Sequence, residues 1–282
     1  MISKKLSMKN FLIILTACLL LTNCQQKTEG CLDPEAINFA VEVDKSCDSC
    51  CQYPLLQINL GAIWGDEANT FSYQKIWTDA QGKPFKIDTI AFYLSDFQLI
   101  NSATGKVAAI MDSVRLRIFP DSLGEFFQRD IILARPTNGT YNVGTMLVKG
   151  SFDQIKFKIG LGNEPNNVIP TRTPASHPLR PQPEGMWGEA TKSFYFLKIK
   201  MKKDTAAATA QTIYQWPKSL GTREVVLDFS KSTSWKRGIS PVVRLVVDYS
   251  KWFDGVDLNQ SDAVIFDKIL NNIAGAFVLK AP

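Results

Sequence analysis

The chain has 282 residues, of which 45% are hydrophobic, a composition typical of a globular protein with one sizeable body. Most of the formal net charge of +5 comes from three lysines within the first nine residues, so the remaining chain lacks the dense basic face of a nucleic-acid-binding protein. His177 is the only histidine, which excludes any site that needs two histidines from one chain.

The first 24 residues have the layout of a lipoprotein signal. A basic start is followed by an apolar run over residues 11–21, which is too short to span a bilayer. The sequence Leu21-Thr22-Asn23-Cys24 resembles a bacterial lipobox, in which the cysteine thiol is acylated before cleavage. We therefore expect a signal peptide over 1–23, a lipid on Cys24 and a tether over 24–29. An ordinary signal peptide with a chance cysteine is the alternative. No later segment reaches eighteen apolar residues, so no membrane-spanning helix is expected. The lipid on Cys24 instead predicts an outer-membrane lipoprotein, periplasmic or surface-exposed.

Residues 30–54 form a cysteine-rich head. Its four cysteines are Cys31, Cys47, Cys50 and Cys51. In an oxidising compartment this set favours two disulfides, and the competing interpretation is one zinc ion held by four thiolates. A direct bond between the adjacent Cys50 and Cys51 needs a strained ring, so each is expected to pair with Cys31 or Cys47.

The opening of the head, Gly30-Cys31-Leu32-Asp33-Pro34-Glu35-Ala36-Ile37-Asn38-Phe39, is similar to a short module found at the start of secreted and lipid-anchored bacterial proteins. Four oxygen-bearing side chains of the head are candidate calcium ligands, with turn and cap formation as the alternative. These residues are Asp33, Asn38, Asp44 and Asp48. A second candidate calcium group precedes the late helix and comprises Asp254, Asp257, Asn259 and Asp262.

The body, residues 55–282, reads mainly as strands. Apolar residues alternate with polar ones in four segments, 114–118, 155–161, 195–201 and 243–249. This pattern predicts antiparallel strands with one buried face, and the longer apolar run 87–100 predicts a central strand pair or a bent strand. One helix is expected over 262–274 with Ser261 as its N-cap. The fold class is therefore an all-β antiparallel sandwich with one late α-helix and a small disulfide-stapled head.

A proline-rich segment interrupts the strands. Five prolines between residues 170 and 183 surround His177 and exclude a central strand there. A long ordered loop on a rigid sandwich is a common place for function, so residues 171–185 are the candidate site. The polar stretch 202–211 is expected to be a hairpin tip.

Four blocks of the body resemble the MbnP-like copper-binding domains, and the resemblance spans roughly residues 55–279. The blocks, with the motifs that carry them, are Ile90–Leu99 with Tyr93-Leu94-Ser95-Asp96, Phe157-Lys158-Ile159-Gly160 with Asn163, His177-Pro178-Leu179 with Met186-Trp187 and Phe194–Ile199, and Val246–Tyr249 with Trp252, Phe253 and Gly255.

The resemblance implies a lipid-anchored or secreted protein that binds copper. In such relatives a tryptophan is oxidised by a partner dihaem enzyme and then joins histidines at the metal. Here it implies His177, Met186 and Trp187 as the metal site, because imidazole and thioether both suit copper. The chain departs from the family by lacking further histidines and a second tryptophan near residues 188–190.

The leading functional hypothesis is a non-catalytic, lipid-anchored envelope protein that handles copper. Its expected partners are the membrane and either a dihaem cytochrome peroxidase or an outer-membrane receptor. The alternative is an adhesion or nutrient-uptake accessory lipoprotein that binds a protein or glycan without metal. An enzyme is not expected, since the chain has no Gly-x-Ser-x-Gly, His-Glu-x-x-His or phosphate-loop motif.

Overall fold

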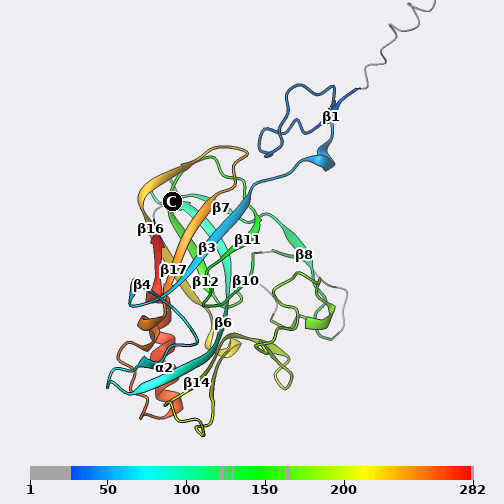
Figure 1. Ribbon diagram of the computed structural model, residues 1–282. Coiled ribbons are helices and arrows are strands. Elements are labelled where there is room, and N and C mark those ends of the chain that lie inside the picture. Colours follow the sequence, from blue (N-terminus) through cyan, green and yellow to red (C-terminus); the bar gives the residue numbers. More distant parts are fainter. Residues whose placement is uncertain (1–26, 121–123, 125, 129, 163–165, 281–282) are drawn as a thin grey trace, which may run out of the picture.

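The computed structural model describes residues 27–120, 124, 126–128, 130–162 and 166–280. The expected signal peptide and Cys24 lie outside these residues. Figure 1 shows a small head beside one end of a strand-rich body, with helix α2 (Asp262–Asn272) at the opposite end. Within the described part of the chain, no helix has the length and apolar character needed to cross a membrane.

The larger sheet has nine strands and is centred on one long strand, β6 (Pro84–Asn101). Its main path runs β13 (Trp187–Gly188), β14 (Ser193–Lys202), β6, β12 (Gly150–Ile159) and β16 (Arg223–Trp235), all antiparallel. Four short strands extend it: β5 (Trp77–Thr78), β7 (Lys106–Ala109), β10 (Ile132–Ala134) and β15 (Thr212–Pro217). The apolar run 87–100 is thus one bent strand rather than a strand pair.

The second sheet has five strands: β3 (Leu55–Trp64), β4 (Asp66–Thr70), β11 (Gly139–Thr145), β17 (Val242–Asp248) and β18 (Phe277–Lys280). Its pairs are antiparallel except β3 with β17, which run parallel. These two strands lie far apart in sequence, so no tight turn dictates their relative direction. The remaining elements are β1 (Glu29–Gly30), β2 (Lys45–Ser46), β8 (Ser113–Arg115), β9 (Phe126–Gln128) and the short 3-10 helices η1 (Asp48–Cys50), η2 (Pro170–Arg172), η3 (Lys218–Leu220), η4 (Tyr249–Phe253) and η5 (Ile273–Ala276).

The two sheets enclose an aromatic core. The Phe157 ring of β12 meets the Phe277 ring of β18 at a centroid distance of 5.2 Å, and Phe92 of β6 contacts Trp252 of η4 at 5.4 Å. All four side chains are buried. Because the Phe157–Phe277 contact joins one sheet to the other within a shared core, the predicted sandwich is confirmed.

Periodicity located several of the long strands correctly. Three of the four alternating segments became β12, β14 and β17, and α2 begins after the Ser261 cap, whose hydroxyl accepts from the Val264 amide. The segment 114–118 is a strand only at its start, in β8. Leu116 is buried as the alternation predicts, and Ile118 forms an isolated bridge with Val168. The predicted tip 202–211 connects β14 to β15.

Strand β14 differs from the prediction of one wet face. Phe196 and Lys198 were expected to face solvent, yet both are buried. The Lys198 ammonium donates to the Gly185 carbonyl at 2.9 Å, which ties the end of the proline-rich segment to this strand. The segment therefore contributes to covering the side of β14 that alternation alone assigns to water.

The head rests against the loop between β16 and β17. The Arg237 guanidinium pairs with the Glu35 carboxylate at 2.7 Å, and the Leu55 amide donates to the Ser240 hydroxyl at 3.1 Å. Gly238 has φ of 68°, and a side-chain carbon there would lie 2.8 Å from the Ala36 carbonyl oxygen. Glycine is thus required for this close approach of the two backbones.

Candidate functional site

His177 lies in the middle of the proline-rich segment and is 2% exposed. Its backbone amide donates to the Pro174 carbonyl at 3.0 Å, and its carbonyl accepts from Arg180 at 3.0 Å, so two consecutive turns hold the residue. Its ring atom Nδ1 accepts from the Leu179 amide at 3.2 Å. A neutral imidazole that accepts at Nδ1 carries its proton on Nε2.

The same histidine lines a cavity of about 360 Å³ between the segment and strands β10 and β11. Arg135, Tyr141 and Gln182 supply part of its polar lining. The Arg135 guanidinium donates to Glu184 at 2.6 and 3.1 Å and to the Gln182 amide oxygen at 3.0 Å. Burial on its own would raise the pKa of Glu184, but the Arg135 hydrogen bonds and charge outweigh it and leave that pKa below its usual value. This ion pair fixes the segment's C-terminal half to the end of β10.

Met186 and Trp187 lie together at a different place. Met186 is buried, and its carbonyl accepts from the Tyr195 amide at 2.8 Å. Trp187 opens β13 and stacks on Phe119 at 5.8 Å, with Phe194 edge-on at 4.8 Å. Met186 and Trp187 line a cavity of about 90 Å³ that His177 does not line.

The three predicted copper ligands line two cavities rather than one. His177 lines the first, Met186 and Trp187 line the second, and Gln182 lines both. Binding through Nε2 would place a proton on Nδ1, which would break the hydrogen bond from Leu179. Among the described residues, no three or more His, Cys, Asp or Glu side chains are grouped to hold a metal ion.

The head contains one disulfide, between Cys31 and Cys51, and two thiols, Cys47 and Cys50. The second disulfide expected from the cysteine count is not formed in the structure, where the Cys50 thiol donates to the Cys47 carbonyl at 2.9 Å. A four-thiolate zinc site is incompatible with the Cys31–Cys51 bond. Hydrogen bonds from the Cys50 thiol and then the Ser49 hydroxyl lower the pKa of Cys47, while the contact with Cys47 raises the pKa of Cys50.

The candidate calcium ligands of the head are used in local structure. Asp33 accepts from the Glu35 amide at 2.9 Å and from the Tyr53 hydroxyl at 2.8 Å. Asn38 bridges Cys50 and Gln52 at 2.8 Å each. The other two accept hydrogen bonds from Thr28 and Ser46, and the group before α2 similarly forms turns around Asp257. These contacts correspond to the turn-forming alternative.

The MbnP family model matches residues 53–269, about three quarters of the chain. The protein belongs to the MbnP family. A solved structure, MbnP from Methylosinus trichosporium, is similar at 11% sequence identity and a TM-score of 0.43, covering 72% of this chain and 78% of that one. No curated protein matches significantly.

Three of the four blocks on which the family resemblance is based are in contact in the fold. The Ser95 hydroxyl donates to the Gly160 carbonyl and accepts from the Gly162 amide, both at 2.9 Å, which joins the first block to the second. The Tyr93 hydroxyl donates to the Pro178 carbonyl at 3.4 Å, which joins the first to the third. Asp96 stands at the bend of β6 with φ of 56° and pairs with Lys158 at 2.6 Å.

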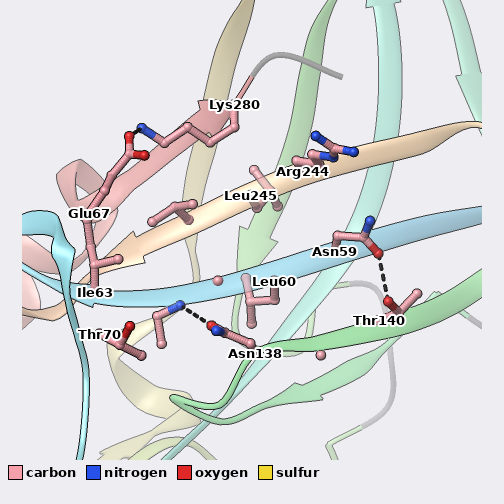
Figure 2. A pocket seen from close by; sticks show the side chains of 14 residues that line it. Asn59, Leu60, Ile63, Glu67, Thr70, Asn138, Thr140, Arg244, Leu245 and Lys280 are labelled. Atoms are coloured by element: carbon pink, nitrogen blue, oxygen red, sulfur yellow. Dashed lines mark hydrogen bonds and ion pairs between the residues drawn. The ribbon is translucent and has the colours of Figure 1, made fainter.

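The MbnP body also has a groove that sequence reasoning missed. It lies on the outer face of the five-stranded sheet (Figure 2). Its volume is about 670 Å³. The Thr140 hydroxyl donates to Asn59 at 2.8 Å along one side, and Lys280 pairs with Glu67 on another. Gly61 forms part of the floor, where a side-chain carbon would lie 3.2 Å from Val246. A glycine inside the apolar strand 55–64 is the signal that could have indicated it.

Proposed function

We propose that this MbnP-family protein is a non-catalytic, lipid-anchored binding protein of the cell envelope that handles copper. The observation that carries the proposal is family membership over most of the chain, since the family is related to copper handling. Its expected partners are the membrane, and a dihaem cytochrome peroxidase or an outer-membrane receptor.

The metal itself is tested by analysis of protein purified without chelators from its native envelope. We expect about one copper per chain and Cu(I) binding that a chromophoric chelator reverses in competition titration. Protein that retains its fold yet neither carries copper nor withdraws Cu(I) from the chelator would exclude copper handling.

The anchor has a separate test. Cells fed an alkyne fatty acid should label the wild-type protein, and Cys24→Ala should abolish the label because the acyl acceptor is removed. Cys47→Ala serves as the matched control and should keep the label. Undiminished labelling of Cys24→Ala would rule out the anchor at this residue.

A second candidate function, presentation of the sandwich to a protein or glycan, is favoured by the outer groove. Its polar groups, among them Asn138 and Arg244, lie beside the apolar Ile63 and Val246. Such mixed lining suits a ligand that combines polar and apolar surface. Arg244→Ala is expected to weaken such binding without affecting copper, and the two candidate functions are therefore separable.

A further inference from the structure

The two thiols of the head form a compact pair. Cys47 and Cys50 flank Asp48 and Ser49 in a Cys-x-x-Cys spacing, and the Cys50 amide donates to the Cys47 carbonyl at 3.2 Å across the turn. The Cys50 sulfur lies 2.9 Å from the Cys47 carbonyl oxygen, which places it over the residue that carries the other thiol, and the Ser49 hydroxyl lies 3.6 Å from the Cys47 sulfur. Both residues are half-buried, so the sulfur pair lies at the surface of the head.

The surrounding contacts hold this pair in place. The Asn38 side chain donates to the Cys50 carbonyl and accepts from the Gln52 amide, both at 2.8 Å. Cys51, the next residue, is fixed by its disulfide to the buried Cys31. On the other side of the turn the Cys47 amide donates to the Gly30 carbonyl at 2.9 Å. The turn is therefore restrained at both ends, and a ligand that bridges the thiols would meet a preorganised turn.

The other soft donors of the described chain are less suitable. His177 uses Nδ1 internally, and Met146, Met186 and Met201 are buried in the body. Met111 is exposed, but as a single thioether it offers one weak ligand. Two thiolates select a soft ion such as Cu(I), whereas structural zinc needs four ligands, and the described residues provide no group of three or more.

We propose that Cys47 and Cys50 bind one Cu(I) ion between their two sulfur atoms. The ion replaces both thiol protons, so two protons are released and no electron is transferred. This inference rests on the proposed copper function and assigns that function to the head rather than to the proline-rich segment.

The test uses the mature protein, prepared without oxygen or thiol reductant, with ascorbate to keep copper as Cu(I) while leaving Cys31–Cys51 intact. Alkylation should first show two free thiols. Competition titration should then give one Cu(I) per chain, and X-ray absorption should show sulfur as the nearest neighbours of copper. In Cys47→Ser/Cys50→Ser the affinity for Cu(I) should fall more than about 100-fold. Loss of a residue that only supports a metal ligand already costs up to about 100-fold, and here the ligands themselves are removed.

His177→Ala/Met186→Leu is the matched control and should keep wild-type affinity and sulfur coordination. Unchanged affinity in folded Cys47→Ser/Cys50→Ser would overturn the thiol site while leaving copper handling intact. A Cys47–Cys50 disulfide in protein isolated from the envelope, found by mass mapping together with absence of copper binding by that protein, would also overturn it. Wild-type protein with two free thiols and no Cu(I) affinity would overturn the proposed function as well.

Discussion

Asp130→Asn is expected to stabilise the protein by about 3 kcal/mol near neutral pH and to make its stability less dependent on pH between about 4 and 6. Asp130 lies between β9 and β10 and is 2% exposed. Burial, with the nearby charge of Asp96, raises the pKa of Asp130 to about 6. Its Oδ1 atom has no hydrogen-bond partner among the described residues.

Asp130→Asn is expected to raise the free energy of unfolding because the pKa of Asp130 is raised in the folded state. A carboxyl with a higher pKa in the folded state contributes fully below about pH 4, and this contribution is lost as pH rises through about 6. At pH 7 the wild-type protein therefore holds an unfavourable buried charge. Asparagine removes that charge, and its side-chain oxygen can still accept the hydrogen bond from the Asp96 backbone amide.

Chemical denaturation at pH 4, 5, 6 and 7.5 measures this effect. Asp153→Asn is the control with the opposite sign, because hydrogen bonds from Ser102 lower the pKa of Asp153. Its carboxylate stabilises the fold above its unfolded pKa and loses that contribution as pH falls. Equal unfolding free energies for wild type and Asp130→Asn at pH 7.5 would contradict the assigned buried charge.

Much of the fold could be predicted because burial of one strand face leaves a period of two in the sequence. Ile155, Phe157 and Ile159 are fully buried, as their alternation with lysines indicates. The pattern failed where both faces of a strand are covered, as at Phe196 and Lys198 on β14. Alternation of polar and apolar residues predicts which face of a strand contacts water. It does not predict that a segment distant in sequence covers that face.

The candidate site was less predictable for a different physical reason. The spacing of His177 and Met186 is compatible with one shared ion, whereas the turns around His177 and the Arg135–Glu184 pair hold the segment so that the two residues line different cavities. Such tertiary contacts are not encoded in local spacing. In the head, four cysteines within 21 residues correctly indicated a disulfide, which joins Cys31 to Cys51. That Cys47 and Cys50 remain thiols at the turn of η1 could not be predicted from the spacing.

The head has too little core to fold on packing alone. Among residues 30–53 only Cys31 and Ala36 are buried apolar residues, and its strands β1 and β2 pair over two residues each. The remaining contacts are hydrogen bonds, which contribute only modestly each where water competes for them, and the solvent-accessible Arg237–Glu35 pair, which contributes at most about 1 kcal/mol. Closure of the loop between Cys31 and Cys51, separated by 20 positions, is worth about 3 kcal/mol in the chain-entropy account. The disulfide is therefore the main source of order in the head.

Cys31→Ser/Cys51→Ser is accordingly expected to unfold the head while the sandwich stays intact. Hydrogen exchange at the Ile37 and Ala40 amides, which donate to Gln52 and Cys31, should accelerate about 100-fold, the equivalent of about 3 kcal/mol. Amides of β12 should keep their protection, because the body has its own aromatic core. Cys47→Ser/Cys50→Ser changes the same number of cysteines and should leave exchange in the head within a few-fold of wild type. Retained protection of Ile37 and Ala40 without the disulfide would show that docking against Arg237 and Gly238, rather than loop closure, holds the head in place.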